Sequence, residues 1–134
     1  MRVLVTGAGG FAGRCTAEHL HASGFDVVGT VHSCRIDAPF ETVQLDLAEP
    51  WADMGDFDAI VHAAGNIPQR EKKFRVLLRN NVDTMRQLVD YAKYHHICRV
   101  IYFSSIGIYG EMRDAVIDEQ SVRINPDAYG LTKY

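Results

Sequence analysis

Three glycines spaced three residues apart constrain the start of this chain, because they follow an apolar run directly and lead into a helical segment. Arg2–Thr6 (RVLVT) has the composition of a buried strand, and Gly7, Gly10 and Gly13 come next. The residues from Phe11 to about Ser23 have helical periodicity. Glycines permit the tight turn that this transition requires and let the helix pack closely against the strand. The segment therefore predicts a strand–turn–helix unit of the kind that builds parallel sheets.

The same alternation of apolar runs and helical segments continues along the chain. The further predicted strands are Asp26–Val31, Thr42–Leu45, Asp58–His62 and Arg99–Ser104. A long helix precedes the last of these strands, and its apolar stripe, which we expect in the core, comprises Val82, Met85, Leu88, Val89 and Ala92. A final helix begins near Ala128. We predict an α/β fold with a doubly wound parallel sheet of the Rossmann type, in one domain over residues 1–134, truncated after the fifth strand and the start of the next helix.

Composition and charge argue against several classes of protein. The formal net charge is −3 and no run is rich in Lys and Arg, which disfavours a nucleic-acid partner. No apolar stretch approaches the ~20 residues that cross a bilayer, and the first strand leaves no room for a leader peptide. Cys15, Cys34 and Cys98 are scattered, and adjacent His95 and His96 fit a solvated helix end better than a metal site. We expect a cytoplasmic protein with no membrane partner.

The glycine loop, Thr6–Gly13 (TGAGGFAG), has the position of a dinucleotide-binding fingerprint between a strand and a helix. Unpaired N–H groups at the start of the helix, around Phe11 and Ala12, would bind the pyrophosphate together with the helix dipole. The simpler alternative is a tight turn that happens to be rich in glycine. The location directly after a first strand favours the dinucleotide site.

The end of the second predicted strand bears on which dinucleotide is bound. An acidic residue there would hold the ribose hydroxyls of NAD, but the sequence has no carboxylate until Asp37. Ser33 and Arg35, with His32, could instead bind the 2′-phosphate of NADP, which suits an arginine fork. The alternative is that these are exposed loop residues. We favour NADP, with NAD as the alternative cofactor.

Tyr129 and Lys133 form a Tyr-x-x-x-Lys pair on one face of the final helix. Six tyrosines make a chance pair at this spacing a serious competitor, so the context matters. Ser104 and Ser105 supply that context, because they end the fifth strand, at the sheet edge where doubly wound folds bind ligands. A free tyrosine has a pKa of about 10, and a nearby ammonium would favour its phenolate form. Hydride transfer at an alcohol carbon needs a proton to leave or reach the same oxygen.

The chain resembles the extended short-chain dehydrogenase/reductases, the group of NAD(P)-dependent epimerases, dehydratases and reductases. The motifs that carry the resemblance are Thr6–Gly13, Asp46-Leu47, His62–Gly65 (HAAG), Asn81-Val82, Phe103–Gly110 (FSSIGIYG), Asp118-Glu119 and the run from Pro126 through Tyr129–Lys133 (YGLTK). They occur in the family's order from one end of the chain to the other.

The resemblance implies a role for each matching residue. Tyr129 would be the general acid/base, Lys133 would favour its phenolate and hold the nicotinamide ribose, and Ser105 would bind the substrate oxygen, with Ser104 structural. The residues implied in cofactor binding beyond the glycine loop are Asp46 and Leu47 beside the adenine, Ala63, Ala64 and Gly65 along the channel, and Asn81, whose role is more often structural.

The function that the resemblance implies is hydride transfer on a sugar nucleotide by an epimerase or reductase. A dehydratase ranks lower, because Ile106-Gly107 replaces an acid/base pair after Ser105. Family members continue beyond this length with a substrate domain and commonly form homodimers, so we expect the substrate domain to be absent and this chain alone to be inactive. The alternatives are a regulatory dinucleotide-binding protein and a structural fragment without turnover.

Overall fold

The computed structural model describes residues 1–33, 35–67, 71–112 and 116–134. Its centre is a five-stranded sheet in the order β3-β2-β1-β4-β5. The strands are β1 (Arg2–Thr6), β2 (Asp26–Val31), β3 (Glu41–Gln44), β4 (Ala59–His62) and β5 (Val100–Tyr102). All four neighbouring pairs are parallel, and the chain order reverses between β1 and β4. The predicted doubly wound parallel sheet of the Rossmann type is confirmed. The strand at which the order reverses, β1, is the one that the glycine turn follows.

Strand boundaries differ from the sequence prediction mainly at β5. The prediction extended this strand through Ser104, whereas the structure ends it at Tyr102. The Phe103 N–H still donates to the His62 carbonyl at 3.0 Å, but the Ser104 N–H turns back to the Tyr102 carbonyl at 3.2 Å. This turn directs the chain away from the sheet, so the two serines lie beyond its edge instead of within it.

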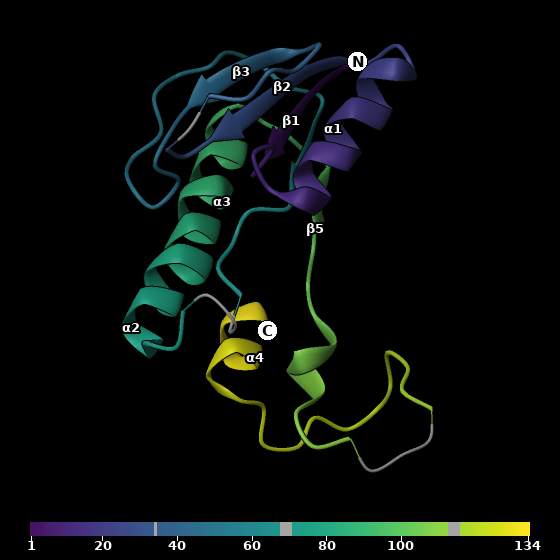
Figure 1. Cartoon of the computed structure of the whole chain (residues 1–134), viewed down its shortest axis with the longest axis vertical. Coiled ribbons are helices and arrows are strands. Elements are labelled where there is room, and N and C mark those ends of the chain that lie inside the picture. The colour runs from purple at the N-terminus through teal and green to yellow at the C-terminus, as the bar shows by residue number, and fades with distance from the viewer. Residues whose placement is uncertain (34, 68–70, 113–115) are drawn as a thin grey trace.

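Helices cover both faces of the sheet. Figure 1 shows α1 (Phe11–Ala22) and α3 (Thr84–Tyr94) on opposite sides of the strands. The long helical segment before β5 begins as α2 (Phe74–Leu77), passes through a π-helical segment, η1 (Leu78–Asp83), and continues as α3. A short 3₁₀ turn, η2 (Ile106–Tyr109), follows β5, and α4 (Ala128–Lys133) ends the chain beside it. No helix among the described residues is long and apolar enough to cross a membrane.

Alternate residues of the strands build two core clusters, one on each face. Val3 and Val5 pack with Ala17 of α1, while Leu4 packs on the other face with Leu88 and Ala92 of α3. This alternation is the period of two that a strand buried on both faces requires.

The predicted apolar stripe of the long helix is confirmed for four of its five residues. Leu88 and Ala92 are buried, and Met85 and Val89 pack partly buried against the same cluster. Val82, in the π-helical segment, is also half-buried but is not among the residues that pack against this cluster. The wider turn of a π-helix shifts the phase of the pattern, and the buried residue of η1 is the polar Asn81.

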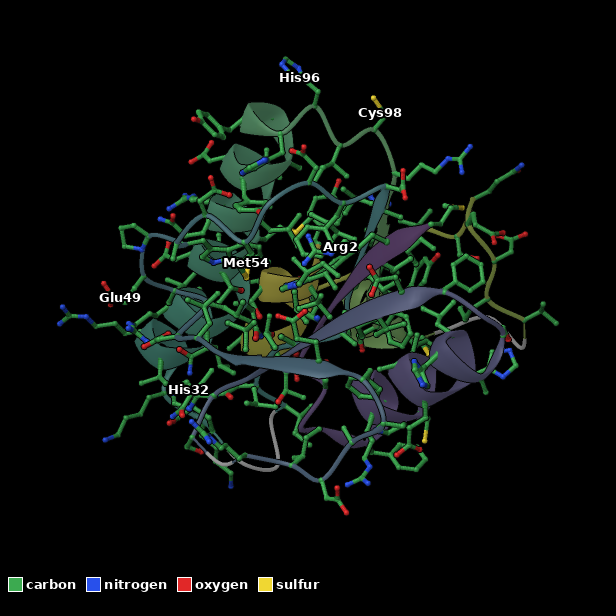
Figure 2. The ribbon with its side chains drawn as sticks, turned by 90° about the horizontal axis from the view of Figure 1, so that it is seen from above. Arg2, His32, Glu49, Met54, His96 and Cys98 are labelled. Carbon is green, nitrogen blue, oxygen red and sulfur yellow. The ribbon has the colours of Figure 1, made fainter. Side chains whose placement is uncertain are left out.

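The predicted solvated helix end is right for one of its two histidines. His96 is exposed and points outward beside Cys98 in Figure 2. The His95 side chain is only 8% exposed and lies 3.0 Å from the Asp56 carboxylate and 3.5 Å from that of Asp53. The ring of this histidine packs on that of Tyr91, with centroids 4.3 Å apart, and this contact covers it from solvent.

Metal-binding clusters are not found in the part of the chain that the structure describes, where no three His, Cys, Asp or Glu residues gather suitably. Cys15 and Cys98 are free and exposed. Cys34 lies outside the described residues.

Candidate functional site

A cleft of about 740 Å³ opens at the carboxyl ends of the strands. It is lined by the turns that follow β1, β2, β3 and β4 and by residues of the helical segment α2–η1–α3. The predicted cofactor residues that line it are Gly7, Gly10, Ser33, Asp46, Leu47, Ala63, Ala64 and Gly65. Residues from four strand ends, distant in sequence, therefore meet where the topology predicts a ligand.

The glycine turn has its shape because a side chain would not fit in it. Gly7 has a φ of +74°, and a β-carbon there would lie 2.8 Å from the backbone of Ala64. A β-carbon on Gly13 would overlap the carbonyl of Gly7, so α1 can approach β1 only with glycine at this position. The Gly10 N–H donates to the same Gly7 carbonyl at 2.9 Å, and the Gly7 N–H donates to the Thr30 hydroxyl at 3.2 Å. These contacts tie the turn to the end of β2.

The first turn of α1 offers backbone donors to a ligand. Gly10 is its N-cap, and no side chain of the described residues caps it. Phe11 and Ala12 begin the helix, are exposed, and stand next to the glycine turn without being among the residues that line the cleft. The first N–H groups of a helix have no partner within it, so this end suits an anion.

The sequence analysis missed a charged group that contacts Asp46, one of the residues that line the cleft. Arg79, in the π-helical segment, donates to Asp46 at 2.9 Å and to Glu49 at 2.7 Å. The Arg79 guanidinium, followed by the Ala48 N–H, lowers the pKa of the Asp46 carboxyl. His32 approaches the same carboxylate at 3.9 Å, and Figure 2 shows His32 and Glu49 on one side of the molecule. Arg79 therefore holds the loop after β3 in place.

The two candidate 2′-phosphate residues differ in their placement. Ser33 lines the cleft. Arg35 is exposed and is not among the described residues that line it.

A smaller cavity of about 110 Å³ continues the cleft toward α4. The two share the lining residues Ala63, Ala64, Gly65 and Asn66. Ile67, Phe103, Ser104, Tyr129 and Lys133 complete the smaller one. The glycine turn and the Tyr-x-x-x-Lys pair therefore line two adjoining cavities, together termed the groove, that share those four residues.

The helix α4 is held against η2 by two glycines. A β-carbon on Gly130 would overlap the carbonyl of Gly107, so the two backbones are in direct contact. A β-carbon on Gly107 would lie 3.4 Å from the Ser105 hydroxyl and 3.6 Å from the Tyr129 ring. Ser105 and Tyr129 therefore lie near the same point beside Gly107, and the structure brings these two predicted residues together. The Asp127 carboxylate caps the helix by accepting from the Gly130 N–H at 2.7 Å.

The two serines make different contacts. The Ser104 hydroxyl donates to the Lys133 carbonyl at 3.1 Å and fixes the end of α4. The Ser105 hydroxyl oxygen accepts from the Gly107 N–H at 3.1 Å, which leaves its own proton free to be donated. Of the two, Ser104 is among the described residues that line the small cavity and Ser105 is not, although Ser105 lies near Tyr129.

Lys133 is an unusually buried lysine. It is 6% exposed, and burial lowers the pKa of its ammonium to about 8. Its Nζ lies 4.5 Å above the centre of the Tyr102 ring. The same atom would be 3.5 Å from a β-carbon on Gly65, so the glycine leaves room for it beside the cleft.

Asn81 connects three segments around the site. It is 1% exposed, its Oδ1 accepts from the Asn66 N–H at 2.7 Å, and its Nδ2 donates to the Asn66 carbonyl and to the Thr132 hydroxyl. Both the oxygen and the nitrogen of the Asn81 side-chain amide therefore have hydrogen-bond partners within the protein. Its contacts fit the structural role expected for it, and Asn80 lines the cleft in its place.

Comparison with known proteins identifies the family. Residues 3–134 match the model of the NAD dependent epimerase/dehydratase family. The chain belongs to this family. The resemblance expected from the motifs is therefore confirmed over nearly the whole chain.

Relatives in the epimerase/dehydratase family share both sequence and fold with the chain. A UDP-glucose 4-epimerase of Corynebacterium glutamicum is 29% identical over 143 residues, which cover 99% of this chain and 44% of the relative. A crystal structure of UDP-galactose 4-epimerase superposes with a TM-score of 0.90 at 26% identity, covering 99% of this chain and 48% of that one. UDP-glucuronic acid 4-epimerase from Bacillus cereus, in complex with NAD, gives 0.83 at 27% identity, covering 99% and 49%. The chain spans about half the length of these relatives.

Several residues of the site were not identified from the sequence. Arg79 and Asn80 lie in the long helix, of which only the apolar stripe and Asn81 were given a role, and Gly107 and Gly130 were identified only as members of motifs. A signal existed for Asn66, since it directly follows the Ala63–Gly65 motif at a strand end. Nothing in the local pattern indicated that Tyr102 would face Lys133.

Proposed function

We propose that this chain is the dinucleotide-binding half of an NAD(P)-dependent epimerase or reductase of the extended short-chain dehydrogenase/reductase type, acting on a sugar nucleotide. The observation that carries the proposal is the groove, whose two adjoining cavities are lined by the glycine turn and by Tyr129 and Lys133, with Ser105 near Tyr129. The relatives named above include three 4-epimerases of UDP-sugars, which supports this class of substrate.

The residues present fit a nicotinamide dinucleotide. The turn at Gly7 leaves a backbone surface that a side chain would fill, and the first N–H groups of α1 suit the pyrophosphate. Asp46 and Leu47 would hold the adenine end, and Ala63–Gly65 would line the path to the nicotinamide end, with Asn81 behind them. When bound, the cofactor supplies hydride acceptance and donation.

The remaining chemistry falls to three side chains. Tyr129 would take a proton from the substrate hydroxyl or return one to its oxygen, and Ser105 would donate a hydrogen bond to that oxygen. The Lys133 pKa of about 8 keeps this group mostly protonated at pH 7, so its positive charge would favour the phenolate of Tyr129. It would also hold the nicotinamide ribose by donated hydrogen bonds.

Turnover by the complete protein that carries this sequence tests these roles. Tyr129→Phe should abolish sugar-nucleotide epimerisation or reduction while leaving NADPH affinity within about twofold, because only the acid/base group is lost. Tyr94→Phe, at an exposed position on α3, is the matched control and should keep full activity. Near-normal turnover by Tyr129→Phe would overturn the assigned role.

We further propose NADP as the cofactor, with NAD as the alternative. Support comes from the absence of a carboxylate at the end of β2 and from Ser33 in the lining of the cleft. Titration should show NADPH binding more tightly than NADH, and Arg35→Ala should remove the difference, whereas Arg99→Ala, an exposed arginine before β5, should not. Equal affinities in the unmodified protein would refute this preference and favour NAD.

A second candidate is a dinucleotide-binding protein without turnover. The observation that favours it is the cleft beside the glycine turn, which is formed by residues of this chain and would hold a dinucleotide. The 134-residue chain should then bind NADPH and show little turnover of UDP-sugars. Robust turnover by this chain would exclude the second candidate.

A further inference from the structure

The aromatic ring of Tyr102 faces the ammonium of Lys133. The Nζ atom lies 4.5 Å from the ring centre, within the range of a cation–π contact. Lys133 is 6% exposed, so its ammonium has lost most of its contact with water. A ring face is one of the few neighbours that attract a cation without supplying a charge, and the attraction grows as water is removed.

Tyr102 is held in this position by its neighbours in the sheet. It pairs with His62 in the β4–β5 register, and the two rings stack with centroids 5.7 Å apart at 18°. His62 is fully buried, and its Nδ1 lies 2.7 Å from the hydroxyl of Thr6, its partner in the β1–β4 register. Thr6, His62 and Tyr102 thus form one row across the carboxyl ends of three adjacent strands.

The row presents an uncharged surface to Lys133. Burial, followed by the charge of Lys133, lowers the pKa of His62 to about 4, so its imidazole is neutral at pH 7. Burial also raises the pKa of Tyr102, with Tyr129 contributing in the same direction. Tyr102 therefore stays protonated, and its ring face, not an ionised hydroxyl, meets the ammonium.

We propose that Tyr102, backed by His62, is the positioning residue of the Lys133 ammonium and holds it at the Gly65 side of the groove. The placement explains how a buried lysine keeps a defined position although none of the ion pairs among the described residues joins it to a carboxylate. The consequence for catalysis rests on the proposed function, because it requires Lys133 to act on Tyr129 and the nicotinamide ribose. The contact itself does not depend on that role.

The experiment is a pH titration of the 134-residue chain with ¹³C-labelled lysine, followed by NMR. Tyr102→Leu retains apolar bulk but removes the ring face, so the pKa of Lys133 should fall by about half a unit to one and a half units. The contact between the Lys133 ε-methylene and Gly65 should also be lost. Tyr102→Phe keeps the ring and should preserve both. Ile101→Ala, on the same strand and 57% exposed, is the control and should change neither.

The outcomes separate the inference from the function beneath it. An unchanged or raised pKa of Lys133 in a folded Tyr102→Leu chain would overturn the inference. A changed Lys133 pKa or a lost Lys133–Gly65 contact in Tyr102→Phe would also overturn it, since the effect would then depend on the Tyr102 hydroxyl and not on the ring face. If Tyr102→Leu does not fold, His62→Leu gives the second test, because loss of the stack should weaken the Lys133–Gly65 contact. If Lys133→Met leaves NADPH affinity unchanged, the role of Lys133 in cofactor binding is wrong, whereas the inferred contact between Tyr102 and Lys133 is not affected.

Discussion

The carbonyl oxygen of Gly107 occupies the space where a β-carbon on Gly130 would lie. This contact presses the first turn of α4 against η2 and sets Tyr129 beside Ser105. Gly130→Ala should therefore push α4 away, because the obstacle is backbone and cannot rotate aside. Overpacking of this kind costs about 1–3 kcal/mol, so amide exchange at Leu131 should accelerate at least about tenfold.

Leu131→Ala provides the control for the Gly130 experiment. Leu131 is 53% exposed on the same helix, so truncating it should leave exchange of the α4 amides nearly unchanged. NADPH affinity should fall in Gly130→Ala, since Lys133 moves with the helix. Unchanged amide exchange and NADPH affinity in Gly130→Ala would contradict this prediction, because they would show that η2 shifts to make room for the added methyl group.

Gly13 and Gly9 offer a matched pair in the glycine loop. A β-carbon on Gly13 would overlap the Gly7 carbonyl, whereas one on Gly9 would lie 3.7 Å from Val31, an ordinary contact. Gly13→Ala should lower the free energy of unfolding by about 2–4 kcal/mol, and Gly9→Ala by less than about 1 kcal/mol. Urea unfolding measures both, and similar losses would contradict the assigned packing.

His62 should make stability depend on pH in a defined window. Its pKa is about 4 in the folded chain and near 6.5 when unfolded, so the unfolded state binds more protons between these values. Stability is therefore complete above pH 6.5 and falls toward pH 4, by up to about 3 kcal/mol. Urea unfolding of wild type against His62→Gln isolates the contribution, with exposed His96→Gln as control. Parallel pH curves for wild type and His62→Gln would refute the neutral buried state.

Lys133 should reduce stability at neutral pH. Its pKa is about 8 when folded against 10.5 in its ordinary state, so the unfolded state binds the proton more tightly. The penalty is complete below pH 8 and disappears as the pH rises toward 10.5. Lys133→Met should therefore be more stable at pH 7 by about 1–3 kcal/mol, with a difference that narrows above pH 8.

The same substitution should weaken NADPH binding if Lys133 holds the cofactor. Gain of stability with loss of binding is the pattern expected of a residue kept for function. Lys93→Met, exposed on α3, is the control and should change neither quantity much. A loss of stability in Lys133→Met at pH 7 would mean that its contact with Tyr102 outweighs its desolvation.

The local pattern of apolar and polar residues was sufficient to predict most of the fold. β1 and β2 have the predicted boundaries, and α1 begins where Phe11 follows the glycines. Strand and helix periods are properties of neighbouring residues, so they can be recognised before any tertiary contact forms. The prediction failed at Val82 and Ser104, where a π-helical segment and a backbone turn depend on what the chain packs against.

By itself, the sequence determined which residue types the candidate site contains: the glycines of the turn, Ser105, Tyr129 and Lys133. The tertiary structure alone decided their partners. It placed Arg79 on Asp46, the Tyr102 ring beneath Lys133, and Gly107 against Gly130. These contacts join residues that are about 20 to 30 positions apart or more, and no periodicity of a single strand or helix specifies them. Packing of separate elements against one another specifies them, because burial and close approach depend on both surfaces at once.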